Sequence, residues 1–281
     1  MNRASSRAWT HDDVRHGARP ALLWIALGAF TMIAVLLTAA PANWLARYVA
    51  ATSDGRILLA DARGSIWHGD AVLGVATGRT GLGSKRQASS ALALPGRINW
   101  AVEMPRGLAL VLRLTQDGVL PQPVRVSLGT SVIAVEAGRA LLPAELLWLL
   151  GAPLNTLRPE GRLEVRWDAL KIAANRPLVA AAEVRVADLA LAASTVRPLG
   201  DYRVVLKSDQ RGLNWRLDTE RGPLKLEGTG SISRGSPEKV EASVRASAAA
   251  DASPQTVERL KPLLDALGRR VGGVAVIEVK S

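Results

Sequence analysis

Apolar and polar residues alternate along much of the chain after residue 55. Four stretches keep this alternation, namely 97–104 (RINWAVEM), 107–115 (GLALVLRLT), 162–171 (RLEVRWDALK) and 212–218 (GLNWRLD). A period of two residues is that of a β-strand with one buried face. Trp100, Trp167 and Trp215 each fall on the apolar side of such a stretch. We therefore predict strands here, with the three tryptophans packed in a core or forming an apolar contact face.

Shorter candidate strands fill the rest of this region. They lie at 57–62, 66–75, 124–129, 132–137, 178–191, 202–207, 224–230, 240–246 and 274–279, with Gly, Pro and Asp at the breaks. This spacing predicts an all-β, mostly antiparallel domain. Two arrangements stay open. A sandwich would hide its apolar faces against each other, whereas a single curved sheet would enclose an apolar groove for lipid or for a hydrophobic segment of another protein.

Three short stretches have features of helices. Residues 41–52 begin with a proline, which the first helical position tolerates, and we expect an amphipathic helix on the membrane surface or on the first strands. Residues 143–150 are apolar and end before Gly151, a natural helix end. Residues 253–267 begin with Ser and Pro, which favour an N-cap and first position, and we expect this helix to cover an open side of the sheet.

The segment 21–40 contains twenty residues without a charge. A helix of this length spans roughly 30 Å, the thickness of the hydrocarbon core of a bilayer. "APA" at 40–42 resembles a signal-peptide cleavage site, but the apolar run is longer than the usual signal core, so we favour an uncleaved anchor. Four arginines precede it and predict a cytoplasmic N-terminus. We thus expect a tail (1–20), a transmembrane helix (21–40) and a periplasmic β-domain (41–281).

Net charge and cysteine content narrow the classes of partner. The chain carries a net charge of +11. Its basic residues alternate with apolar ones instead of forming a patch with interleaved aromatics, so we predict no nucleic-acid binding, while anionic lipid headgroups fit somewhat better. The chain has no cysteine, which excludes disulfides, a thiolate nucleophile and cysteine-ligated metal.

Catalytic chemistry would have to pass through His68, the single histidine after residue 16. Ser65 and Asp70 are near it in sequence, but in a strand Ser65 would point to the opposite face. The stretch 78–85 (GRTGLGSK) has the wrong order for a phosphate loop and fits a flexible connection. We predict no catalytic, cofactor or metal site, and expect the protein to act by binding and not as an enzyme.

The stretch 64–69 (GSIWHG) places a tryptophan between two glycines. Gly64 and Gly69 mark points where a strand bends or admits a close neighbour. We expect Trp67 to be a buried side chain that fills the start of the sheet near the membrane. Gly64, Trp67 and Gly69 are therefore predicted to be structural residues and not a ligand site.

Several of these residues also carry a family resemblance. The matching positions are Pro41, Ala42, Trp44, Leu45, Gly55, Arg56, Leu59, Gly64, Trp67, Gly69 and Ala71. With the blocks LPGRINWAV, LRPEGRLEVRW, LGDYRVVL and GPLKLEGTGSI further on, this order resembles the type II secretion system protein N family. The resemblance covers nearly the whole chain.

The resemblance implies an accessory component of the inner membrane, without catalytic residues, in the machine that exports folded proteins from the periplasm of Gram-negative bacteria. Its partners would be other inner-membrane components of that machine. The implied fold is a curved sheet like those of AsmA-like and lipid-transfer proteins, with two or three short helices. A periplasmic lipid-binding or lipid-transport protein of AsmA-like kind, which takes up acyl chains, is the alternative.

Overall fold

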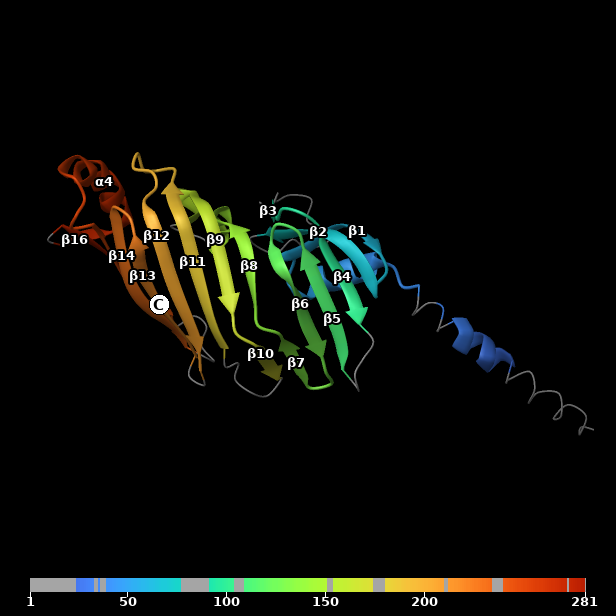
Figure 1. Ribbon diagram of the computed structural model, residues 1–281. Helices are drawn as coiled ribbons and strands as arrows, with labels where there is room; N and C mark the ends of the chain where they lie inside the picture. Colours follow the sequence, from blue (N-terminus) through green and yellow to red (C-terminus); the bar gives the residue numbers. More distant parts are fainter. Residues whose placement is uncertain are drawn as a thin grey trace, which may run out of the picture.

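The computed structural model describes residues 24–32, 35, 39–76, 91–103, 109–150, 154–173, 180–209, 212–233, 240–271 and 273–280. Its main feature is a long layer of antiparallel strands that curves along its length (Figure 1). The strands form two hydrogen-bonded sheets, here called the first and the second sheet.

The first sheet has the order β1-β2-β4-β5-β6-β7-β10, with β3 beside β2. Its strands are β1 (Ile57–Gly64), β2 (His68–Ala76), β3 (Ala91–Ala93), β4 (Ile98–Glu103), β5 (Leu110–Gln116), β6 (Leu120–Leu128), β7 (Val132–Val135) and β10 (Leu170–Ala173). The second sheet has the order β8-β9-β11-β12-β13-β14-β15-β17-β16. Its strands are β8 (Gly138–Pro143), β9 (Pro159–Trp167), β11 (Ala180–Leu191), β12 (Gly200–Ser208), β13 (Gly212–Arg221), β14 (Leu224–Ser233), β15 (Val240–Ala248), β16 (Arg269–Val271) and β17 (Val274–Lys280).

Two chain segments pass between the sheets and join them. After a short interruption β7 continues into β8, and β9 continues into β10. Val135 pairs with Leu170, and three positions further along, Gly138 pairs with Trp167, so one antiparallel register runs across the interruption. Leu73 of β2 and Trp167 of β9 pack against the same buried cluster. The apolar faces of both sheets therefore look into one interior, which we call the inner face.

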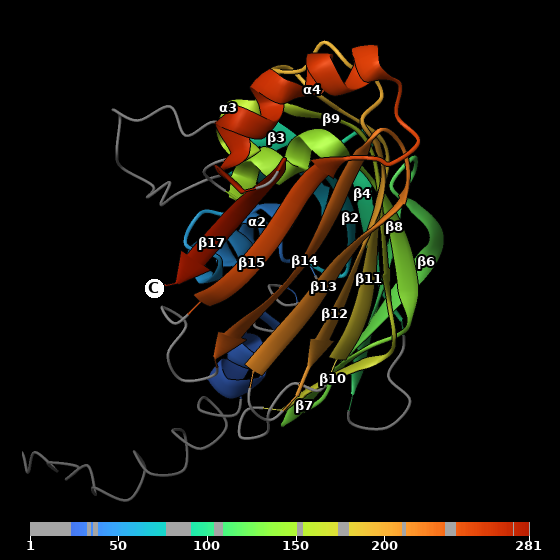
Figure 2. The same cartoon turned by 90° about the vertical axis from the view of Figure 1, so that its left-hand side faces the viewer.

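Four short helices lie against this sheet. They are α2 (Ala42–Thr52), the 3₁₀ helix η1 (Ala144–Leu150), α3 (Leu154–Leu157) and α4 (Pro254–Leu267). α2 packs on β1, and its Leu45 joins the buried cluster around Trp100. α4 lies across one end of the curved sheet (Figure 2). Ser253 caps α4 as its sequence predicts, because its Oγ accepts a hydrogen bond from the Thr256 N–H at 3.2 Å.

The largest buried cluster lies between α4 and the second sheet. Leu260 and Leu263 of α4 are almost completely buried there, together with Leu224 of β14. Tyr202 is also buried, and its hydroxyl donates a hydrogen bond to the Leu224 carbonyl at 2.9 Å. Desolvation raises the pKa of this hydroxyl, which keeps it a neutral donor. The end of the inner face under α4 is therefore closed by a well-packed core.

The prediction of a mostly antiparallel, all-β domain is confirmed. Neither open arrangement is observed as such, because the strands form two sheets that lie side by side in one curved layer (Figure 1). Some boundaries were wrong. The predicted helix 143–150 begins at Ala144 and is a 3₁₀ helix, because Pro143 still belongs to β8. The predicted strand 162–171 is interrupted after Trp167, where the chain changes sheets. α3 is a fourth, one-turn helix that sequence patterns did not indicate.

Part of the apolar segment 21–40 is described. Residues 24–32 and residue 35 are helical, and residues 39–40 lead into α2. Within the described residues, no helix is long and apolar enough to cross a membrane. The predicted tail 1–20 and the connection 78–85 lie outside the described residues.

Candidate functional site

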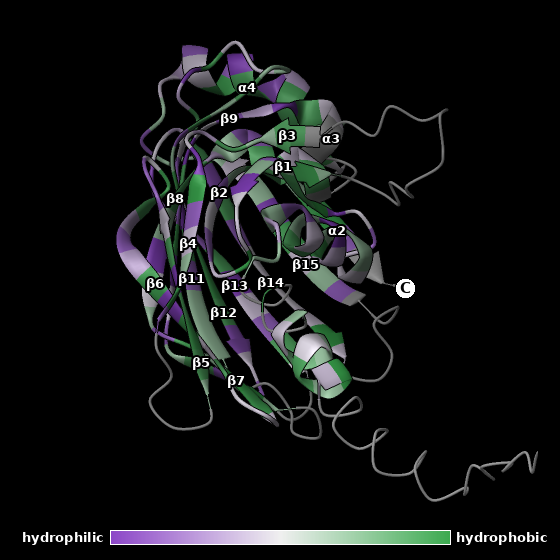
Figure 3. Cartoon of the chain, turned by 90° about the vertical axis from the view of Figure 1, so that its right-hand side faces the viewer, coloured by the Kyte–Doolittle hydropathy of each residue, from purple (hydrophilic) through white to green (hydrophobic). Residues whose placement is uncertain are grey.

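The inner face of the second sheet is apolar in successive cross-strand rows. One row contains Trp167, Ala182, Leu206, Trp215, Gly230 and Ala242, and the next contains Val165, Val184, Val204, Leu217, Gly228 and Val244. The alternation behind these rows appears as alternating colours along the strands in Figure 3. Because side chains of directly paired residues share a face, the strand pattern builds a continuous apolar surface.

This surface is covered at one end and open at the other. Near α4, Val186 and Ala246 are buried, whereas Leu206 and Trp215, further along the same strands or their neighbours, are only half-buried. The first sheet contains a cross-strand row that is not covered by α2, and its side chains are more exposed than Leu206 and Trp215. It consists of Leu110, Leu128, Ile133 and Ile172, with 41%, 39%, 40% and 43% of their surface exposed. We call Leu206, Leu213, Trp215 and Ile232 together with this row the open strip.

An opposing glycine accompanies each of the three strand tryptophans. The directly paired residues are Trp100 with Gly69, Trp167 with Gly138, and Trp215 with Gly230. A Cβ atom at Gly69 would lie 2.6 Å from the Trp100 ring, and one at Gly138 would lie 2.7 Å from the Trp167 ring. Each indole therefore lies over the bare backbone of its neighbour, a contact that a side chain on the opposing residue would prevent.

The three tryptophans differ in how far they are available for contact. Trp100 is 4% exposed and lies in the buried cluster with Ala42 and Ala71, so α2 covers it. Trp167 and Trp215 are half-buried on the inner face, and the Trp167 Nε1–H donates to the Glu136 carbonyl at 2.9 Å. Of the three, Trp215 belongs to the open strip. Trp100 therefore belongs to the core, and of the predicted set only Trp167 and Trp215 have partly exposed side chains on the inner face.

The Gly64–Gly69 stretch forms a turn between β1 and β2. Gly64 adopts φ +87°, a left-handed conformation that favours glycine, and it pairs directly with Gly69. The Ser65 Oγ accepts hydrogen bonds from the backbone N–H groups of Trp67 and His68, each at 3.2 Å. Because of this turn, β2 begins at His68 and not at Ile66 as the alternation predicted. The two glycines are therefore explained by local backbone geometry.

Trp67 itself is half-buried, and its carbonyl accepts a hydrogen bond from the Val102 N–H at 2.6 Å. The ring that fills this end of the sheet belongs to Trp100, whose Nε1–H donates to the Ser65 carbonyl at 3.1 Å. The sequence indicated a buried tryptophan here, but the residue with that role comes from β4.

His68 is placed beside Ser65, with 3.4 Å between Nδ1 and the Ser65 Oγ. The prediction that these two side chains point apart was wrong, because Ser65 lies in the turn and outside the regular strand. Asp70 is instead bound by Arg97, whose guanidinium also bonds Asp61 at 2.9 Å. The acid that a Ser-His-Asp triad needs is therefore engaged elsewhere. Among the described residues there is also no cluster of metal-ligating side chains.

The outer face of the second sheet is polar and carries a network of ion pairs. Glu183 of β11 lies 2.6 Å from Arg203 and 2.8 Å from Arg185, while Glu164 lies 2.9 Å from Arg166. The hydrogen bond from Arg203 lowers the pKa of the Glu183 carboxyl, against a smaller opposing effect of burial. These charges keep the outer face solvated, so the two faces of the sheet differ sharply in chemistry.

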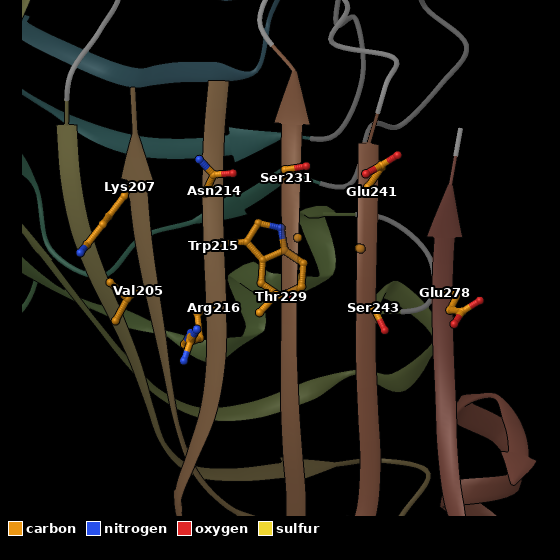
Figure 4. A pocket seen from close by; sticks show the side chains of 12 residues that line it. Val205, Lys207, Asn214, Trp215, Arg216, Thr229, Ser231, Glu241, Ser243 and Glu278 are labelled. Carbon is orange, nitrogen blue, oxygen red and sulfur yellow. The ribbon is translucent and has the colours of Figure 1, made fainter. Parts of the chain in front are cut away.

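A hollow of about 870 Å³ lies on strands β12 to β17. Figure 4 shows Lys207 and Arg216 on one side of it and Glu241 and Glu278 on the other, with Ser231 between them. The hollow exists because β14 and β15 carry small side chains at these positions. Its charges are divided between two sides, and among the described residues Arg216 forms no ion pair. The sequence alone did not indicate it, since its lining comes from five strands.

A family model matches most of the chain. The family model described as type II secretion system (T2SS), protein N, matches residues 55–276, most of the chain and nearly all of its strands. Neither the curated proteins nor the solved structures gave a match.

Proposed function

The chain belongs to the type II secretion system protein N family, and from this premise we propose that it is an accessory component held in the inner membrane, which supports export through protein–protein contacts. In this proposal residues 21–40 form the anchor, residues 1–20 lie in the cytoplasm, and residues 41–281 form the periplasmic domain. The uncharged run of 21–40 and the arginines before it support this topology.

The open strip supports the contact role. Exposed apolar side chains in one continuous row are typical of surfaces that bind a partner. The strip is bounded on its other side by the core under α4, where Leu260 is fully buried. An apolar face that is closed at the α4 end fits the binding of a partner's apolar segment better than passage of a lipid from end to end. We therefore place the contact with another secretion component on the open strip.

A matched pair of substitutions on β5 tests this proposal. Leu110 is 41% exposed on the open strip, whereas Arg113 is exposed on the outer face. We expect Leu110→Asp to reduce secretion in a strain that has no other copy, with exported proteins accumulating in the periplasm. Arg113→Asp, which adds the same side chain on the other face, should secrete normally. Equal levels and equal melting temperatures of both variants would show that folding is not the cause.

A photoreactive amino acid at Ile133 identifies what covers the strip. We expect a crosslink to a protein of the secretion machine in cells, and loss of this crosslink when Leu110→Asp is added. The same probe at position 113 serves as the control. If the Ile133 probe gives no protein adduct in secreting cells, the open strip is not the contact surface.

A second candidate function is lipid binding, which the partly exposed apolar side chains on the second sheet favour. Half-exposed Leu206, Leu213 and Ile232 offer an apolar floor of the kind that acyl chains occupy. Mass spectrometry of the full chain, extracted in mild detergent, tests it. Stoichiometric phospholipid that is lost from the Leu206→Asp variant would support a lipid site, while equal lipid on both proteins would oppose it.

We further propose that the protein acts by binding and not by turnover. The engagement of Asp70 by Arg97 supports this view, because this carboxylate is then not available as the acidic partner of His68. Reproducible hydrolysis that disappears in the His68→Ala variant would contradict it.

A further inference from the structure

The end of the apolar segment is tied directly to the β-domain. The Ala40 carbonyl accepts a hydrogen bond from the Ile66 N–H at 2.9 Å, and Pro41 forms an isolated antiparallel bridge with Ser65. Ala40 and Ala42 are 3% and 1% exposed. The chain thus passes from residue 40 into α2 without a flexible linker. The Gly64–Gly69 turn holds this passage in place.

α2 has two different faces. Ala42 and Leu45 point toward the buried cluster under the helix. On the opposite face, Trp44 and Tyr48 are 56% and 67% exposed. They are four residues apart, so they lie on the same side of the helix, next to exposed Arg47. Among the described residues Arg47 forms no ion pair. We call Trp44, Arg47 and Tyr48 the aromatic stripe.

Connectivity fixes how far the aromatic stripe can be from the apolar segment. Four residues separate Ala40 from Trp44, a span of at most about 14 Å. Tyr48 lies one helical turn further, about 6 Å along α2. The headgroup layer on each side of a bilayer is roughly 5–8 Å thick. A helix that starts this close to the end of a membrane anchor reaches the headgroup layer if it lies along the surface.

We propose that the aromatic stripe docks into the headgroup layer of the membrane, and that it fixes the tilt of the β-domain on its anchor. The proposal rests on the anchoring part of the proposed function. Tryptophan and tyrosine prefer this layer because their rings are apolar with one polar group. Arg47 is placed to meet lipid phosphates, which attract basic side chains near the surface.

The chemistry of the stripe favours a lipid surface over a protein partner. A protein contact would need a broad, complementary patch, whereas the exposed large apolar side chains of α2 are the two aromatics on either side of Arg47, which has no ion-pair partner in the described part of the chain. The bridge between Pro41 and Ser65 also keeps α2 in one orientation relative to the sheet. Docking of the stripe would therefore orient the entire domain.

Spin labels at single cysteines test the proposal, because the chain has no native cysteine. The full chain is reconstituted in bilayers of phosphatidylethanolamine and phosphatidylglycerol at a ratio of about 3:1, a surface with the negative charge that basic side chains seek. The Tyr48→Cys label should collide more often with oxygen, which concentrates in the bilayer, than with a water-soluble nickel chelate. The Arg113→Cys label, on the outer face of β5, should show the reverse ratio.

Equal ratios at the two positions would overturn the proposal. Resistance of the same samples to carbonate extraction reports separately on the anchor, so loss of docking and loss of anchoring are distinguishable. Quenching by brominated lipids gives a second measurement without a label. We expect the wild-type chain to be quenched more than Trp44→Phe, and no difference between the two would also contradict docking.

Discussion

The indole ring of Trp100 lies over Gly69, the residue directly opposite it on the neighbouring strand. The contact leaves room for the ring under α2, where Trp100 is almost fully buried. Trp167 over Gly138 repeats the same arrangement in the second sheet. The pairing of a large and an absent side chain is therefore a recurrent way in which this curved sheet fills its inner face.

Gly69→Ala should destabilise the protein by about 1–3 kcal/mol, because its Cβ would overlap both the Arg63 carbonyl oxygen and the Trp100 ring. Gly74→Ala is the matched control on the same strand. A Cβ at Gly74 would meet Leu58 at 3.6 Å, an ordinary contact, so its effect should stay within about 0.5 kcal/mol. Urea unfolding at neutral pH measures both. Equal losses would show that the close packing of the Arg63 carbonyl and the Trp100 ring around Gly69 does not require the glycine.

Trp100→Ala should cost about 3–5 kcal/mol in unfolding free energy, since it empties a buried site. Trp67→Ala should cost clearly less, about 1–2 kcal/mol, because the Trp67 side chain is only half-buried. Thermal unfolding of the two variants compares them directly. A larger loss for Trp67→Ala would restore Trp67 as the side chain that fills the start of the sheet.

The contact between the end of the apolar segment and the β-domain predicts that a disulfide can be engineered between them. Pro41 and Ser65 are bridge partners, and antiparallel partners have Cα atoms about 4.5–5.5 Å apart, within the range for a disulfide. The Pro41→Cys/Ser65→Cys variant should therefore crosslink under mild oxidation, seen as a shift in non-reducing electrophoresis. Asn43→Cys/Ser65→Cys should not, because Asn43 is exposed on α2 and is not a bridge partner of Ser65. Crosslinking of both pairs alike would indicate a loose junction.

The lowered pKa of Asp201 predicts that the folded protein becomes less stable in acid. Burial raises its pKa, but the hydrogen bond from the Asp188 N–H at 2.8 Å and the ion pair with Arg221 outweigh this effect. The pKa of Asp201 in the folded protein is therefore lower than its ordinary value of 3.8. A carboxyl with a lowered pKa stabilises the fold above its unfolded pKa, and this contribution disappears as the pH falls through the folded value.

Asp201→Asn should accordingly unfold at lower urea concentration than wild type at pH 7. The difference should shrink at pH 3, which is below the ordinary pKa of 3.8, because the unfolded chain then takes up a proton that the folded carboxyl binds less readily. Urea midpoints at both pH values give the comparison. A difference that is the same at both would mean that the charge of Asp201 does not contribute.

Strand positions were largely predictable, because a strand that is buried on one face alternates apolar and polar residues. Leu163, Val165 and Trp167 alternate with polar residues, and β9 contains them as expected. The same pattern could not show that the chain changes sheets after Trp167. A change of sheet depends on which strands lie alongside, and the residues at the junction carry no distinct local signal.

The glycine partners and the open strip were not predictable for a related reason. Gly138 and Trp167 are far apart in sequence, and their pairing depends on the register of whole strands. Likewise, alternation identifies Leu110 and Ile133 as apolar-face residues, but it does not tell whether a helix covers them. Only the position of α2 in three dimensions leaves this row exposed.

The order of strands in space follows their order along the chain almost throughout, from β1 to β17. In the proposed topology the tail stays in the cytoplasm, so the strands that follow the anchor reach the periplasm in chain order, with β1 first, and this order affects how they assemble. Each strand that emerges can pair at once with the strand that precedes it, so the sheets can assemble stepwise from the anchored end. A domain of this kind exposes one growing edge at a time, which limits the unpaired backbone available for aggregation during export.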